Sequence, residues 1–213
     1  YNKGCRMKRV LIATPALNEQ VNAYFAHSLQ ESIKLGIKND IDFNCVFLAN
    51  ESILPMARNE LINLCYREKY DCMVFIDSDQ SWDPQCLINI VQSNKDVLAV
   101  PVVNKHDAQN TFNVHYTKAE YKDGYLVADS VGTGFLKLSY EAVVKVCEFS
   151  EETFFRGKML RNVCEYTISP SGFVGEDITL CRKLKKLGYD ILIDTEYTSN
   201  HHGNKMYVGS FRD

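Results

Sequence analysis

The sequence predicts an α/β protein with a mostly parallel central sheet flanked by helices. Short apolar runs alternate with amphipathic stretches through the first hundred residues, which is the pattern of strand–helix–strand units. The run at residues 72–76 has no polar alternation, as in a strand that is buried on both faces. Hydrophobic residues make up 46% of the 213 positions, enough for a core of this kind.

The first half of the chain is expected to be regular. The strands are residues 10–13, 43–48, 72–76 and 97–103, and the helices are residues 24–35, a stretch from residue 55, and residues 84–93. We expect Thr14-Pro15 to end the first strand and Gly36 to end the first helix. Asp83 is a suitable N-cap for the third helix, because a proline follows it at the first helical position.

The second half is less regular. Strands are expected at residues 131–138 and 191–193, helices at residues 140–147 and 176–187, and a hairpin or long loop at residues 104–124. Residues 151–173 mix charge, aromatic residues and glycine, which indicates a mobile or partner-shaped loop. No repeat or linker composition divides the chain, so we expect a single domain over residues 1–213.

Composition excludes several classes of protein. The net charge is −3, which gives no basic field for a nucleic acid. Of the eight cysteines, none forms a CxxC pair, and Cys72 stands in an apolar run, so we expect structural thiols in a reducing compartment. No apolar run approaches the ~20 residues of a membrane span, and the polar N-terminus is no secretory signal. These features predict a cytoplasmic location.

The most informative segment is Asp77-Ser78-Asp79, which follows the strand at residues 72–76. Strand periodicity places the two carboxylates on one side, at the carboxyl end of a strand, where open α/β sheets bind ligands. Two close carboxylates repel each other unless they share a cation. Mg²⁺ or Mn²⁺ would satisfy them and leave positions for phosphate oxygens. The alternative is a pair of solvated aspartates, which the preceding buried strand disfavours.

Other candidates are weaker alone. His201 and His202 follow the last strand and could supply an imidazole ligand for Mn²⁺, or be a surface pair. Arg58 opposes the helix dipole in a first turn unless an anion lies nearby, and a surface arginine is an equal alternative. Glu176 and Asp177 open a helix, where they could cap it or act as a general base.

The glycines at residues 132 and 134 provide backbone that a ligand can approach closely, or they form a β-bulge. No GxGxxG follows a strand and no GxxxxGK[ST] is present, which disfavours dinucleotide-binding Rossmann enzymes and P-loop NTPases.

In their order, these motifs resemble a small GT-A glycosyltransferase over about residues 8–205. The motifs are Ala13-Thr14-Pro15, Pro55-Met56-Ala57-Arg58-Asn59, Asp77-Ser78-Asp79, Gly132-Thr133-Gly134-Phe135, Gly175-Glu176-Asp177 and His201-His202-Gly203. More narrowly, the chain is similar to the N-terminal glycosyltransferase domain of a chlorovirus multidomain protein thought to build capsid glycans. The resemblance implies a GT-A fold, with a nucleotide-sugar-binding half at about residues 8–103 and an acceptor half at about residues 104–213.

The resemblance also implies roles for individual residues. The residues implied for nucleotide-sugar binding are Thr14, Pro15, Ala16, Arg58, Asp77, Ser78, Asp79 and Gly134. The implied metal ligands are Asp77, Asp79 and His201, which matches the family pattern better than His202. Asp177, with Glu176 beside it, matches the family's catalytic base, a role that holds only if the enzyme inverts the anomeric configuration.

The expected function is metal-dependent transfer of a hexose or deoxyhexose, glucose or rhamnose, from a UDP-sugar to a hydroxyl of a glycan or glycoprotein. Mn²⁺ or Mg²⁺ would be the cofactor, and the resemblance leaves room for further domains of a longer polypeptide. One alternative is a non-catalytic module that binds a sugar nucleotide or a glycan. Another is a metal-dependent nucleotidyltransferase, which usually has a glycine-rich basic loop after the first strand; residues 14–18 contain neither glycine nor lysine.

Overall fold

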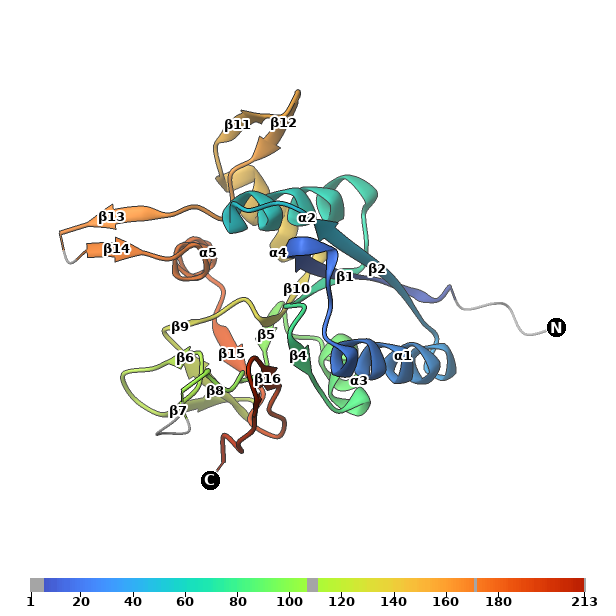
Figure 1. Cartoon of the computed structure of the whole chain (residues 1–213). Coiled ribbons are helices and arrows are strands. Elements are labelled where there is room, and N and C mark those ends of the chain that lie inside the picture. The colour runs from blue at the N-terminus through green and yellow to red at the C-terminus, as the bar shows by residue number, and fades with distance from the viewer. Residues whose placement is uncertain (1–5, 107–110, 171, 213) are drawn as a thin grey trace.

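A computed structural model describes residues 6–106, 111–170 and 172–212, in which a mixed eight-stranded sheet is flanked by helices (Figure 1). The strand order is β2-β1-β3-β10-β5-β15-β8-β7. The bounds are β1 (Lys8–Ala16), β2 (Ile41–Ala49), β3 (Cys72–Ile76), β5 (Val97–Ala99), β7 (Glu120–Lys122), β8 (Tyr125–Ala128), β10 (Phe135–Ser139) and β15 (Ile191–Ile193). Both halves of the chain therefore contribute strands to one sheet.

Helices cover both faces of this sheet. They are α1 (Ala23–Lys38), α2 (Leu54–Glu68), α3 (Pro84–Gln92), α4 (Tyr140–Phe149) and α5 (Glu176–Lys186). Successive residues of β1 point to opposite faces, so Val10 joins a buried cluster with α1 and α3, while Leu11 joins a second cluster with α2, α4 and α5. Two hydrophobic layers thus hold the sheet, as expected for an α/β domain.

Most strands of the sheet point in one direction, as predicted, but many neighbouring strands pair in antiparallel fashion. β10 lies between β3 and β5 and is antiparallel to both, and β8 is antiparallel to β15 and to β7. The other described strands of the sheet run in one direction. The insertion of β10 joins the second half of the chain to the carboxyl edge of β3, where Asp77 N donates to Gly134 O at 3.0 Å.

Two predicted element ends were wrong for packing reasons. β1 continues through Pro15 to Ala16, because its pairing with β3 ends at Ala13 and residues 14–16 pair with β2 alone. α1 continues past Gly36 to Lys38. A Cβ at Gly36 would lie 2.5 Å from Cε2 of Phe43, so this glycine allows the helix to approach β2 rather than ending the helix.

Two predicted strands are interrupted. The run at residues 97–103 gives β5 and two isolated bridges, Val102 with Ser199 and Val103 with Phe112. The run at residues 131–138 divides into β9 (Ser130–Val131) and β10. β9 pairs with β6 (Val114–His115), which lies in the predicted loop at residues 104–124; residues 107–110 of that loop lie outside the described part.

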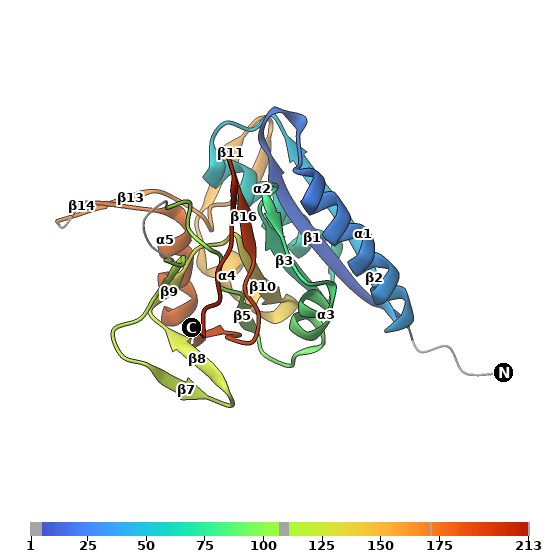
Figure 2. The same cartoon turned by 60° about the horizontal axis from the view of Figure 1, so that its bottom comes forward.

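The segment at residues 151–173 is more ordered than predicted. It forms the hairpin of β11 (Glu152–Phe155) with β12 (Lys158–Arg161), and β13 (Thr167–Ser169) pairs with β14 (Gly172–Val174). The β13–β14 pair extends away from the body of the molecule in both views (Figures 1 and 2).

A small sheet completes the fold at the carboxyl edge of β3. Its order is β17-β16-β4, with β4 (Gln80–Ser81), β16 (Asn200–His202) and β17 (Met206–Tyr207). Pairing of His201 with Gln80 brings the end of the chain to the predicted acidic motif. In the part of the chain that the structure describes, the seven cysteines are free thiols, and no helix has the length and apolar character to cross a membrane.

Candidate functional site

The acidic motif forms a turn between β3 and β4. β3 is buried along its whole length, and the half-buried residues Asp77, Ser78 and Asp79 follow it directly. Ser78 O accepts a hydrogen bond of 2.8 Å from Asn22 N, at the start of α1. The turn is therefore fixed to α1 on one side and, through the bond from Asp77 N, to Gly134 on the other.

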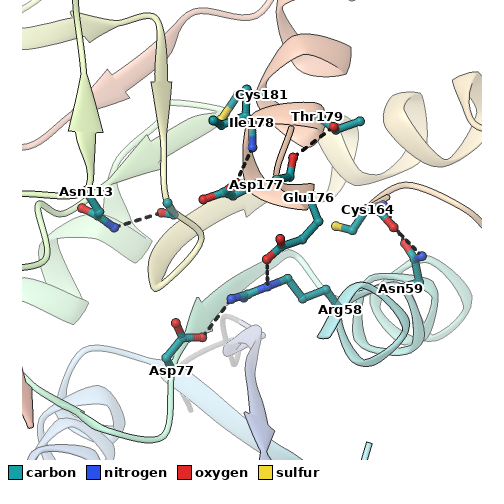
Figure 3. Close-up of polar contacts among 12 residues, drawn as sticks. Arg58, Asn59, Asp77, Asn113, Cys164, Glu176, Asp177, Ile178, Thr179 and Cys181 are labelled. Carbon is teal, nitrogen blue, oxygen red and sulfur yellow. Dashed lines mark hydrogen bonds and ion pairs between the residues drawn. The ribbon is translucent and has the colours of Figure 1, made fainter. Parts of the chain in front are cut away.

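Asp77 belongs to a buried charge network. Nη2 of Arg58 lies 3.2 Å from Oδ1 of Asp77, and Nε lies 3.2 Å from Oε1 of Glu176 (Figure 3). The Arg58 side chain is only 4% exposed. Burial by itself would lower the pKa of Arg58, but the carboxylates of Asp77 and Glu176 raise it. Arg58 thus forms ion pairs with two carboxylates from elements far apart in the sequence.

The resemblance implies that Arg58 reaches the nucleotide, and this stays a prediction. In the structure, two of the three guanidinium nitrogens of Arg58 bind carboxylates. Its third nitrogen, Nη1, is buried and has no hydrogen-bond partner among the described residues. The side chain is therefore placed to orient Asp77 and Glu176.

Asp79 has separate partners. Its Oδ2 lies 2.6 Å from Nζ of Lys105 and 3.3 Å from Nε2 of His201. Burial would raise the pKa of Asp79, but hydrogen bonds with His201 and Lys105 lower it to about 2. Asp79 is therefore ionised at neutral pH.

The two histidines of β16 point in opposite directions, as neighbours in a strand do. Nδ1 of His201 lies 2.9 Å from Val103 O and, because a carbonyl only accepts, Nδ1 donates this hydrogen bond; Nε2 lies toward Asp79. His202 instead bonds Ser81 Oγ through Nε2 at 2.8 Å and stacks on Tyr24, with ring centroids 4.9 Å apart. Burial lowers the pKa of His202, which suits a neutral packing role.

Asp79 and His201 fit one side of a divalent cation. A protonated Nδ1 held by a carbonyl is the usual arrangement behind a metal-binding imidazole. Asp77 turns to Arg58 instead, and the described residues contain no group of three or more His, Cys, Asp or Glu side chains that could hold a metal. Mg²⁺ and Mn²⁺ commonly take one or two protein ligands and complete their shell with water and phosphate oxygens. An oxygen and an imidazole nitrogen match that chemistry.

The glycine segment shapes the site through its lack of side chains. A Cβ at Gly134 would overlap Nε2 of Gln80 and lie 3.2 Å from Oδ2 of Asp77. Gln80 has little room to move, because it is 1% exposed and its Oε1 accepts from Ser199 Oγ at 2.8 Å. A Cβ at Gly132 would lie 2.7 Å from Nδ2 of Asn113. Both glycines therefore allow side chains of the protein itself to pack against the backbone, and the expected approach of a ligand stays a prediction.

Asn113 and Asn63 were not identified from the sequence, and Asn59 was named only as the last residue of the motif at residues 55–59, without a role. Asn59 on α2 bonds both the N–H and the C=O of Cys164, at 2.7 and 2.8 Å (Figure 3). Asn63, one turn later, bonds both backbone groups of Arg161 at 2.9 and 3.0 Å. The two side-chain amides thus bond backbone groups as a neighbouring strand would, and they hold the segment before β13 against α2. Their signal in the sequence is two asparagines four residues apart on one helix.

Asp177 lies in the first turn of α5 and is half-buried, and its Oδ1 accepts from Ile178 N at 2.7 Å. A Cβ at Gly175 would lie 2.6 Å from the same oxygen, so a glycine before Glu176 leaves space for this carboxylate. The neighbouring Glu176 points instead to Arg58 (Figure 3).

The end of β1 holds the remaining predicted donor-binding residues. Thr14 is fully buried, and its hydroxyl has no hydrogen-bond partner in the described part of the chain. Ala16 is buried and Pro15 half-buried. An unpaired buried hydroxyl is unusual in a folded protein, so Thr14 retains an unused hydrogen-bonding group.

Comparisons with known proteins bear on the fold. No family model matches the sequence, and no curated protein gives a significant match. The solved structures that resemble the chain include A197 from STIV, with a TM-score of 0.55 and 17% identity over 92% of this chain and 86% of A197. At this identity the likeness concerns the fold alone. The predicted α/β fold class of the GT-A type, a large central sheet flanked by helices, is confirmed.

Two other solved structures are less similar. GalNAc-T7 with UDP, GalNAc and Mn²⁺ has a TM-score of 0.48 and 11% identity, and the match covers 94% of this chain but only 44% of GalNAc-T7. A putative glucose-1-phosphate thymidylyltransferase from Bacillus anthracis, in complex with a sucrose, has a TM-score of 0.38 and 9% identity over 68% of this chain and 76% of its own. Both TM-scores are too low to support an inference about this chain.

The packing around Gly134 gives a testable prediction. Gly134→Ala should lower the free energy of unfolding by about 1–3 kcal/mol, because the new methyl group overlaps Gln80 and crowds Asp77. Urea denaturation measures this change. Gly203→Ala is the matched control, since a Cβ there meets its neighbours at ordinary contact distances of 3.4 Å or more. Equal stability of Gly134→Ala and the wild type would contradict this prediction, because Gln80 and Asp77 would then accommodate the added methyl group.

Proposed function

We propose that this protein is a metal-dependent glycosyltransferase that uses a UDP-sugar donor. The proposal depends on one observation: an ionised carboxylate, Asp79, and an imidazole nitrogen, His201 Nε2, lie 3.3 Å apart at the carboxyl edge of β3. That edge is where open α/β sheets bind nucleotides. A divalent cation held by this pair would neutralise negative charge on the leaving diphosphate.

The surrounding residues are suited to position a donor. Asp77 is oriented by Arg58 through Oδ1, and its Oδ2 faces the Gly134 backbone, where a ribose or a water on the cation could be bound. Thr14 offers its unpaired hydroxyl at the end of β1, with Pro15 and Ala16 beside it for the base and ribose. In this proposal, Ser78 and Gly134 provide backbone close to the diphosphate.

Asp177 is the proposed catalytic base. Glu176 is held by Arg58, whereas Asp177 bonds only the backbone among the contacts described for it. A half-buried carboxylate at a helix start can take the proton of an acceptor hydroxyl as that oxygen attacks the anomeric carbon and the bond to UDP breaks. This direct displacement inverts the anomeric configuration.

The acceptor would approach over the β11–β12 and β13–β14 hairpins. Tyr166 directly precedes β13 and Phe173 lies in β14, with ring centroids 4.9 Å apart, and Phe173 is 70% exposed. Burial raises the pKa of Tyr166, and the charge of Glu176 raises it further. Aromatic faces of this kind suit a sugar ring. We propose a glycan hydroxyl as acceptor, on a viral capsid glycan, and glucose or rhamnose as the transferred sugar.

The test of the proposed function is metal-dependent release of UDP. UDP-glucose and UDP-rhamnose, incubated with Mn²⁺ and the wild-type protein, should release UDP, and Asp79→Asn should lower the rate by at least ~100-fold, because it removes the charge that binds the cation. Asp123→Asn is the matched control, since Asp123 lies in the β7–β8 turn and pairs with Lys95. It should keep the wild-type rate.

Equal turnover by Asp79→Asn and the wild type would contradict the metal-dependent mechanism. Tight binding of UDP-sugars without metal and without turnover would identify a non-catalytic sugar-nucleotide-binding module instead. Calorimetric titration with and without Mn²⁺ separates these outcomes.

The base role of Asp177 has its own test. Asp177→Asn should lower turnover by about 10²–10⁴-fold, the range typical of a lost general base, while leaving the affinity for UDP with Mn²⁺ unchanged. The substitution keeps an oxygen to accept from Ile178 N, so the helix start is preserved. Unchanged turnover, or a product that retains the anomeric configuration, would exclude the assignment.

A further inference from the structure

We propose that Lys105 is a built-in counter-cation that competes with the divalent cation for Asp79. The inference rests on the proposed function, because it concerns the same metal site. Nζ of Lys105 lies 2.6 Å from Oδ2 of Asp79, the same oxygen that lies 3.3 Å from Nε2 of His201. The ammonium group thus lies against the carboxylate oxygen that His201 also faces.

The backbone around Lys105 directs the side chain to this position. Lys105 lies two residues after Val103, whose carbonyl accepts from Nδ1 of His201. The segment at residues 103–105 therefore positions both the lysine and the imidazole. A Cβ at Gly203 would lie 3.4 Å from Cδ and 3.5 Å from Cε of Lys105. The aliphatic part of Lys105 therefore passes beside the β16–β17 turn before its charge reaches Asp79.

Electrostatics makes the two cations mutually exclusive. A divalent ion bound to Oδ2 of Asp79 would meet the Lys105 ammonium within a few ångströms, and the repulsion of like charges at that distance is large outside bulk water. The Lys105 side chain is 38% exposed and has a flexible four-carbon stem, so it is free to swing away. The released charge would remain close to the bound diphosphate.

This arrangement differs from an ordinary surface ion pair. Lys122 pairs with Asp190 at the same distance of 2.6 Å, but it lies on β7 and is 60% exposed. Such exposed pairs contribute about 0–1 kcal/mol to stability. At Asp79, by contrast, the ammonium group of Lys105 and the Nε2 atom of His201 both lie against Oδ2. A metal-binding nitrogen and a lysine at the same oxygen indicate a site where one cation can replace another.

The experiment measures binding of Mn²⁺ alone, without nucleotide, by the loss of the free Mn²⁺ electron paramagnetic resonance signal. Lys105→Gln should bind Mn²⁺ on the order of tenfold more tightly than the wild type, because the competing charge is gone. Lys105→Arg keeps the charge and should bind Mn²⁺ as the wild type does. Lys122→Gln removes a matched charge elsewhere and should leave the affinity unchanged.

Unchanged or weaker Mn²⁺ affinity in Lys105→Gln would overturn the inference, and so would the absence of Mn²⁺ binding in every variant. An equal gain in Lys122→Gln would also overturn it, because the effect would then reflect net charge. Thermal unfolding of each variant confirms that it is folded. Failure of the proposed function is a separate observation: the wild type would bind Mn²⁺ but release no UDP from UDP-sugars.

Discussion

The structure depends on how it balances negative charge at the carboxyl edge of β3. Asp77 and Asp79 lie two residues apart, and two such carboxylates cannot share a partly buried site without compensation. The fold supplies it in separate places: Arg58 from α2 pairs with Asp77, while Lys105 pairs with Asp79, which His201 also contacts. Removing the buried Arg58 would destabilise the protein, since it would leave unpaired carboxylates. The partly exposed Lys105 can be exchanged for another cation. The site therefore has a stable half, formed by Arg58 and Asp77, and a changeable half, formed by Asp79 with Lys105 and His201.

The stable half connects the sheet to the opposite end of the chain. Glu176 opens α5 and shares Arg58 with Asp77, so one guanidinium group joins the proposed donor site to the helix start that carries the proposed base, Asp177. Asn59, next to Arg58 on α2, fixes the segment that leads to the β13–β14 hairpin. The changeable half is formed by strand pairing at long range, because β16 adds to β4 and carries His201 to Asp79.

Much of this could be predicted from the sequence because it is local. The apolar run of β3 followed by two aspartates predicted the strand and the acidic turn, and Asp83 accepts from Gln85 N as the predicted cap of α3. The insertion of β10 between β3 and β5 depends on pairing between distant segments and leaves no local pattern. The close approach of Gly36 to Phe43 depends on how α1 packs on β2, which the glycine alone does not reveal. Lys105 was missed because its partner is 26 residues earlier in the chain.

The central claim is that Asp79 and His201 hold a divalent cation against a nucleoside diphosphate. The most direct measurement is anomalous diffraction from crystals soaked with Mn²⁺ and UDP. The account predicts a manganese peak bonded to Asp79 and to Nε2 of His201, with diphosphate oxygens on the remaining positions and Lys105 moved off the carboxylate. Bound UDP with no manganese at Asp79, and Lys105 still paired to it, would contradict the account.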